Sequence, residues 1–138
     1  LMVRAMDTEL SIQQVAAITQ VSAHTLRYYE RIGLLTRVAR ATSGHRRYAS
    51  QDIAWINFLM RLRATGMPIR EMQQFAELRR QGDRTLAQRR KLLETHHQQI
   101  HQQLDELTQN LQVIHNKIQH YQELEALHGT NSLTGHQD

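Results

Sequence analysis

A stripe of apolar residues near the carboxyl end constrains this chain more than any other feature. Its members alternate in steps of four and three residues, the spacing of a coiled-coil seam: Ile100, Leu104, Leu107, Leu111, Ile114, Ile118 and Tyr121. A helix over residues 84–127 would be about 60 Å long at 1.5 Å per residue, longer than the small domain before it could cover. We therefore expect this helix to pair with that of a second copy. Folding of the stripe back onto its own domain is the alternative.

Two short helices joined by a brief turn are predicted at the amino end, an arrangement typical of a helix-turn-helix. Ser11 is the expected N-cap of the first helix and Ser22 that of the second. The first helix should bury one apolar face, made of Ile12, Val15, Ala16 and Ile18. The second should bury Leu26, Tyr29 and Ile32. Its outward residues are then His24, Thr25, Arg27 and Tyr28.

A small β-hairpin, or wing, is predicted for residues 34–49, around a turn at Ser43 and Gly44. Ser50 is the expected N-cap of a third helix that Gly66 ends, and Pro68 should lie in the first turn of a fourth.

The predicted fold class is therefore mainly α. A winged helix-turn-helix DNA-binding domain is expected over residues 11–80, followed by a long coiled-coil dimerisation helix over residues 84–127. Residues 128–138 are expected to form a flexible tail, and residues 1–10 a start that is disordered or foreign to the natural protein.

Charge is distributed unevenly along the chain. Residues 1–70 carry ten basic and four acidic side chains, a balance of +6, whereas residues 71–138 carry seven and nine, a balance of −2. Between Arg27 and Arg63, eight arginines face only Glu30 and Asp52. Such a cluster beside a helix-turn-helix predicts contact with the phosphates of DNA.

Three segments together resemble the MerR family of transcription regulators: VSAHTLRYYERIGLL, SGHRRY and LRATGMPIREM, within residues 10–81. The resemblance implies that the second helix and the wing bind double-stranded promoter DNA, and that the long helix pairs antiparallel in a homodimer. It also implies activation at promoters whose two elements lie too far apart. The dimer would bend and untwist that DNA and so realign it for RNA polymerase.

The candidate DNA contacts lie on the second helix, in the wing and at the end of the third helix: Ser22, His24, Thr25, Arg27, Tyr28, Tyr29, Ser43, Arg46, Tyr48 and Arg63. Neighbours on a helix point about 100° apart, so one of Tyr28 and Tyr29 is expected at the DNA and the other partly in the core. Arg46 and Tyr48 match the Arg-x-Tyr pattern of the family's wing. The family usually carries glycine where Gln20 stands, in a turn that can require a positive φ.

The stretches RLRATGMPI and RRQGD resemble the subgroup that responds to aldehydes and other electrophiles, often through a reactive cysteine near the end of the third helix. Arg61 stands at about that position and the chain has no cysteine. Covalent thiol sensing and thiolate metal sites are thereby excluded.

Neither a cofactor nor a metal site is predicted. His97 and His101 have the four-residue spacing that can hold a transition metal, but we interpret the histidines of the long helix as dispersed on its solvent-facing surface: His96, His97, His101, His115 and His120.

An enzyme is not expected, because no carboxylate pair, Ser-His motif or phosphate-binding glycine loop is present. No apolar run reaches the roughly 20 residues that cross a bilayer, so we expect a cytoplasmic protein without a membrane partner. The alternative function is that of a dimeric helical adaptor whose basic half binds an acidic protein.

Overall fold

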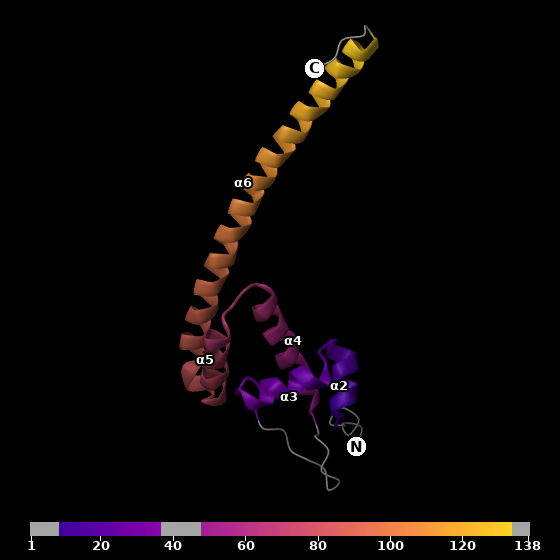
Figure 1. The fold of residues 1–138 in the computed structure, drawn as a ribbon. Coiled ribbons are helices and arrows are strands. Elements are labelled where there is room, and N and C mark those ends of the chain that lie inside the picture. Colours follow the sequence, from indigo (N-terminus) through magenta and orange to yellow (C-terminus); the bar gives the residue numbers. More distant parts are fainter. Residues whose placement is uncertain (1–8, 37–47, 134–138) are drawn as a thin grey trace, which may run out of the picture. The chain divides into compact units, whose positions relative to one another are not determined.

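The computed structural model describes residues 9–36 and 48–133 and divides the chain into two units, residues 1–94 and 95–138. Figure 1 shows the helices in chain order: α2 (Ile12–Thr19), α3 (Ala23–Arg31), α4 (Ser50–Ala64), α5 (Ile69–Arg80), a short 3-10 helix η1 (Asp83–Thr85) and α6 (Leu86–Leu133). The expected mainly helical architecture is therefore confirmed.

The predicted wing falls mostly on residues 37–47, which lie outside the described part of the chain. At its end, the described residues form one isolated antiparallel bridge, between Leu10 and Tyr48. The two backbones exchange hydrogen bonds of 2.7 and 2.8 Å. This bridge ties the segment before α2 to the segment before α4.

Helices α2 and α3 form the predicted helix-turn-helix. Ser11 caps α2 through a capping box with Gln14, and Ser22 caps α3, as expected. The predicted buried face of α2 is wrong at Ile18, whose side chain is 55% exposed. Thr19 is buried in its place and donates its hydroxyl hydrogen to the Val15 carbonyl at 2.8 Å. The hydroxyl finds its acceptor within the helix, so a polar residue can face the core there.

Helices α4 and α5 begin one residue away from where the sequence predicts. Ala49, not Ser50, is the N-cap of α4, and the Asp52 carboxylate accepts a hydrogen bond from the Ala49 backbone N–H at 2.8 Å. Pro68 is the N-cap of α5 and not a residue of its first turn. Gly66, with φ of +90°, adopts a left-handed backbone conformation directly after the C-cap of α4.

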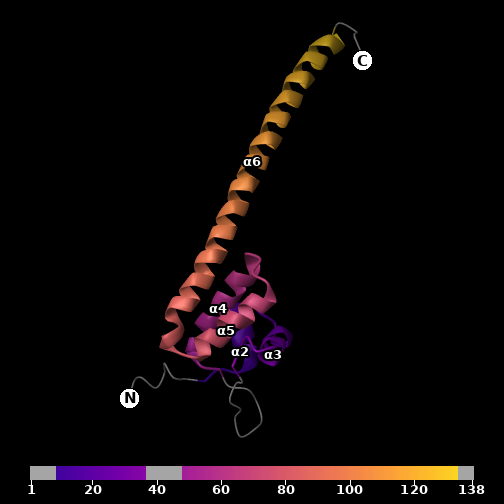
Figure 2. The same ribbon diagram turned by 90° about the vertical axis from the view of Figure 1, so that its left-hand side faces the viewer.

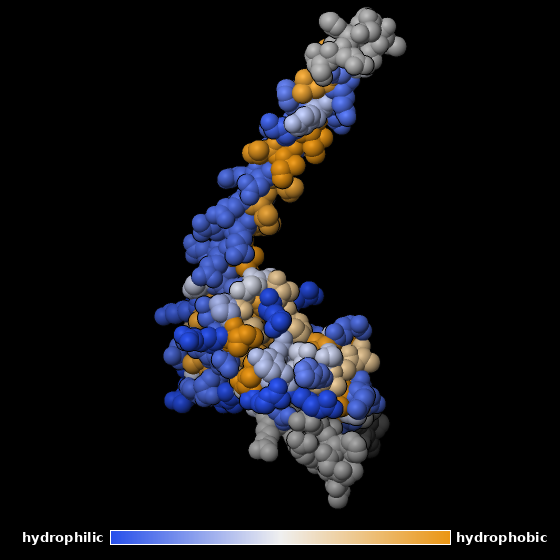
Figure 3. All heavy atoms as spheres, viewed as in Figure 1, coloured by the Kyte–Doolittle hydropathy of each residue, from blue (hydrophilic) through white to orange (hydrophobic). Residues whose placement is uncertain are grey.

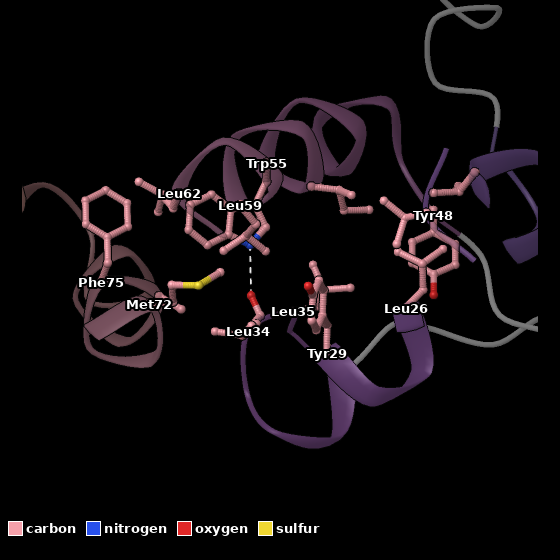
Figure 4. Packing of buried hydrophobic residues seen from close by; sticks show 14 of the residues in the cluster. Leu26, Tyr29, Leu34, Leu35, Tyr48, Trp55, Leu59, Leu62, Met72 and Phe75 are labelled. Atoms are coloured by element: carbon pink, nitrogen blue, oxygen red, sulfur yellow. Dashed lines mark hydrogen bonds between the residues drawn. The ribbon is translucent and has the colours of Figure 1, made fainter. Parts of the chain in front are cut away.

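The core of the first unit lies between α2, α3, α4 and α5, and Figure 4 shows part of it. Leu26 and Tyr29 enter it from α3, Trp55 and Leu59 from α4, and Met72 from α5. Within this core the rings of Trp55 and Phe75 stack with centroids 5.8 Å apart. Figure 2 shows the helices of this unit after a rotation by 90°. The outward face of α3 is thus carried on a closely packed base.

Helix α6 runs without a break to Leu133, beyond the expected end at residue 127 (Figure 2). The helix thus extends into the first residues of the segment 128–138, for which a flexible tail stays a prediction. A single glycine, Gly129, costs about 1 kcal/mol in a helix, which does not stop a helix of this length.

The apolar stripe on α6 is uncovered, and Figure 3 shows it as a line of hydrophobic side chains along the helix. From Leu104 to Tyr121 its six members are between 51% and 65% exposed, and Ile100 is half-buried. No described helix is long and apolar enough to cross a membrane.

Candidate nucleic-acid interface

Helix α3 divides into a core face and an exposed face, as the sequence predicts. Leu26 and Tyr29 are buried, whereas His24, Arg27 and Tyr28 are exposed. The two adjacent tyrosines separate clearly, since the side chain of Tyr28 is 38% exposed and that of Tyr29 only 1%. The exposed face therefore offers an imidazole, a guanidinium and a phenol to a partner.

The amino end of α3 holds two hydroxyl groups in fixed positions. The Ser22 hydroxyl accepts a hydrogen bond from the Thr25 backbone N–H at 3.1 Å and donates one to the Thr25 hydroxyl at 2.9 Å. Thr25 can in turn donate its hydroxyl hydrogen outward. The positive end of a helix dipole also favours phosphate at this position.

A hollow of about 310 Å³ joins the start of α3 to the end of α4. It is lined by Gln20, Val21, Ser22, Thr25, Tyr28, Tyr29, Met60 and Arg63. Five of these are predicted DNA contacts, and Arg63 joins them from a different helix. Gln20, Val21 and Met60 are not among the DNA contacts predicted from the sequence. The sequence indicates these three residues only indirectly. Gln20 and Val21 form the turn of the helix-turn-helix, and Met60 precedes Arg63 by about one helical turn.

Arg31 is a further exposed cation on α3 and is not among the predicted DNA contacts. Its guanidinium lies over the ring of Tyr28, 5.4 Å from the centroid. This cation-π contact keeps Tyr28 and Arg31 together on the exposed face of α3.

Tyr48 is not placed as predicted. Its side chain is 1% exposed and lies beside Leu26 in the core (Figure 4), so it cannot present its ring to DNA. Burial of this largely apolar ring stabilises the fold. Tyr29 is equally buried, which leaves both tyrosines in positions to support the interface from beneath. The predicted contacts Ser43 and Arg46 lie outside the described residues.

Three long side chains hold the backbone that follows α3. The Trp55 indole N–H donates to the Leu34 carbonyl at 2.9 Å (Figure 4), and the Gln73 amide donates to the Ile32 carbonyl at 2.8 Å. The Arg80 guanidinium donates to the carbonyl between them, that of Gly33, at 3.0 Å. We call these three residues the clasp. They fix the end of α3 to both α4 and α5.

Arg80 is itself held by a carboxylate on its own helix. The Glu77 carboxylate accepts two hydrogen bonds from the Arg80 guanidinium, at 2.6 and 3.1 Å. These bonds, with a hydrogen bond from Gln81 and the positive charge of Arg80, hold the pKa of Glu77 below its usual value. Glu77 therefore stays ionised, and paired with Arg80, below the pH at which a free glutamate is protonated.

The histidines of α6 are not all exposed as expected. His96 is 6% exposed, which corrects the interpretation of a wholly solvent-facing set. The rings of His97 and His101 lie with centroids 6.1 Å apart. In the part of the chain that the structure describes, no three metal-binding side chains come together.

Family models match most of the described chain. One, described as MerR HTH family regulatory protein, matches residues 10–78, and a second, described as MerR, DNA binding, matches residues 53–117. An uncharacterised HTH-type transcriptional regulator of Haemophilus influenzae is 36% identical over 107 residues, which make up 78% of this chain and 79% of that relative.

Two crystal structures resemble this chain over most of its length. One is HiNmlR, described as a MerR family regulator lacking the sensor domain and bound to promoter DNA. It has a TM-score of 0.77 and 33% identity, over 87% of this chain and 95% of that one. The other, a MerR family transcriptional regulator from Listeria monocytogenes, has a TM-score of 0.83 and 31% identity, over 91% of this chain and 96% of that one.

Proposed function

This chain belongs to the MerR family of DNA-binding transcription regulators, and we propose that it binds promoter DNA as a homodimer, with α3 as the recognition helix. The observation that carries the proposal is the exposed face of α3, which joins Arg63 of α4 at one hollow. The promoter DNA in the similar HiNmlR structure supports the same partner for this chain.

The exposed side chains have two roles in this proposal. Thr25, Arg27 and Tyr28 face the DNA from α3, with Ser22 and His24 beside them at its amino end. An arginine on a recognition helix can donate two hydrogen bonds to a guanine, whereas hydroxyls and helix ends mostly contact phosphate.

Other predicted residues act around α3. Arg63 binds a phosphate from α4, while Tyr29 and Tyr48 position the interface from the core. Ser43 and Arg46 belong to the predicted wing and are proposed to extend the contact with the backbone of the duplex.

We assign DNA binding to residues 11–80 and dimerisation to residues 84–127. The seam is the support for the second assignment, because an exposed apolar stripe of this length is covered in solution. The expected occupant is the same stripe of a second copy, since each copy presents the spacing that the other needs. Two copies then carry two recognition helices, which suits a promoter with inverted half-sites.

The dimer is proposed to activate by distorting an overlong promoter spacer, as the family resemblance implies, so that RNA polymerase can engage both promoter elements. Bending a site of this size costs on the order of 1–6 kcal/mol. The contacts that two closely packed DNA-binding domains make at two half-sites can supply that free energy. Distortion of the promoter DNA therefore requires the dimer as well as the recognition helix.

The first prediction tests the role of Arg27. Arg27→Ala should weaken binding to a promoter fragment by about 1–3 kcal/mol, because a side chain at a base edge or phosphate is lost. Fluorescence anisotropy at a series of salt concentrations measures the affinity and the slope of log K against log salt concentration. The magnitude of that slope should fall by about one if Arg27 contacts a phosphate.

Arg90→Ala is the matched control, because it removes the same charge from an exposed arginine that pairs with Glu94 on α6. Its affinity should stay close to that of the wild type. Equal losses in both variants would assign the effect to net charge and contradict the placement of Arg27. Absence of DNA binding by the wild type at every salt concentration would contradict the proposed function and favour an adaptor for an acidic protein.

A further inference from the structure

Another hollow of the first unit shares no residue with the proposed DNA contacts. Its volume is about 480 Å³, and its lining comes from α4, α5 and the start of α6. The lining residues include Trp55, Phe58, Phe75, Arg79 and Arg89. We call this hollow the aromatic groove. Its volume lies within the range of about 300–1,000 Å³ that is typical of sites for small molecules.

Three rings form an apolar side of the aromatic groove. The rings of Trp55 and Phe75 stack with centroids 5.8 Å apart and planes inclined by 16°. The Phe58 ring is tilted against both, with centroids 6.2 Å from Trp55 and 5.9 Å from Phe75. Trp55 and Phe75 are buried and Phe58 is half-buried. This packing holds the rings in place, and such a surface favours contact with another planar ring.

Two guanidinium groups accompany these rings. The Arg79 guanidinium lies over the Trp55 ring, 4.3 Å from its centroid. Arg89 is half-buried, and its Nε donates to the Thr85 hydroxyl at 3.1 Å while Nη2 donates to the Gly82 carbonyl at 2.9 Å. These bonds fix the Arg89 guanidinium and leave its Nη1 without an acceptor among the described residues. The groove therefore has a cation that is positioned in advance.

Neither of these cations is neutralised by a carboxylate. Among the residues that the structure describes, Arg79 and Arg89 form no ion pair, whereas Arg80 pairs with Glu77 and Arg90 with Glu94. The segment 79–91 carries six basic side chains and one acidic one, a balance of +5. Unpaired positive charges beside an apolar surface attract an anion, because it reduces their mutual repulsion. Charge complementarity thus indicates an anionic ligand with an apolar part.

Beyond DNA binding, we propose that the aromatic groove binds a small aromatic carboxylate. The ring of this ligand packs against the aromatic side of the groove, and its carboxylate accepts hydrogen bonds from Arg79 and Arg89. Arginine suits both parts of such a ligand, since its planar guanidinium donates to carboxylates and also stacks on rings. Trp55 is also a member of the clasp, so the ligand lies beside a residue that binds the Leu34 carbonyl after α3.

Trp55 allows a direct test, because it is the one tryptophan of the chain. The NMR spectrum of the full chain therefore contains a single indole N–H signal, and that signal reports on the groove. Titration with benzoate should move it until the site is saturated. Benzamide keeps the ring without the charge, and acetate keeps the charge without the ring. Each should need concentrations at least about tenfold higher for the same shift.

Two variants test the assigned cations. Arg79→Gln and Arg89→Gln should each raise the dissociation constant for benzoate by about tenfold, because each removes a charged donor to the carboxylate. Arg90→Gln is the matched control, since it removes the adjacent exposed cation that pairs with Glu94. It should bind benzoate as the wild type does.

An indole signal that benzoate leaves unchanged would overturn the site, and this is also the result expected if another copy of the chain covers the groove. Benzoate affinity that is the same in both glutamine variants as in the wild type would overturn it as well. Equal responses to benzoate and benzamide would contradict an anionic ligand, and equal responses to benzoate and acetate would contradict an aromatic one. DNA binding is measured separately by anisotropy, so each of these results leaves the proposed function standing.

Discussion

Gln20 adopts the one positive φ among the non-glycine residues that the structure describes. Its φ of 63° and ψ of 25° place it in the left-handed region at the turn between α2 and α3. The side-chain amide donates to the Ala17 carbonyl at 2.9 Å, which satisfies a carbonyl at the end of α2. A glutamine at this position therefore combines a cap for α2 with a strained backbone conformation.

The strain gives a prediction for two substitutions. Gln20→Gly should keep or raise the free energy of unfolding, whereas Gln20→Val should lower it by about 1–2 kcal/mol, because a β-branched residue resists this backbone conformation. Urea denaturation followed by circular dichroism measures both. At Ala17, inside α2, the glycine variant should instead lose about 1 kcal/mol. Equal stability of the two Gln20 variants would contradict a strained turn.

At the scale of elements, the clasp explains how α3 is held in place. Trp55 of α4 and the α5 residues Gln73 and Arg80 all bind the three carbonyls that follow α3. Helix α5 is continuous with the segment that leads into α6. The hydrogen bonds from Gln73 and Arg80 therefore link α5 directly to the carboxyl end of α3.

Removal of one member of the clasp should loosen this end of α3. Arg80→Met deletes the hydrogen bond to Gly33 and the pair with Glu77, so the amides of Leu34 and Leu35 should exchange faster with deuterium. Those amides bind the Tyr29 carbonyl, at 2.9 and 3.2 Å, and report directly on the turn. Arg70→Met, at an exposed arginine of the same helix, is the control. Unchanged exchange in Arg80→Met would show that Arg80 does not hold the turn.

The elements also show which parts of the fold can be predicted from sequence. The caps at Ser11 and Ser22 and the glycine after α4 are local signals, and each predicted a boundary to within a residue. The three hydrogen bonds of the clasp join residues that are separated by 21, 41 and 47 positions in the sequence. No local sequence pattern predicts contacts over such separations. The same limit explains the error at Tyr48, which is buried beside Leu26, a residue far away in the sequence.

At the scale of the whole molecule, the chain separates two tasks. The basic first half carries α3, the proposed recognition helix, and the slightly acidic second half carries the seam. Coiled-coil spacing could be predicted from sequence because it needs only one periodicity. The hollow that joins α3 to Arg63 could not, because it depends on how α3 packs against α4. The proposed function requires both halves, because two DNA-binding domains can bind one duplex together only if the seam joins the two chains.

Selection of bound duplexes from a random pool, followed by sedimentation of each complex, tests this claim most directly. The account predicts that the wild type enriches an inverted repeat and binds it with two chains per duplex, and that Leu111→Glu, which puts a charge in the seam, loses both properties. A single chain on a single half-site, or a pool with no enriched sequence, would contradict it.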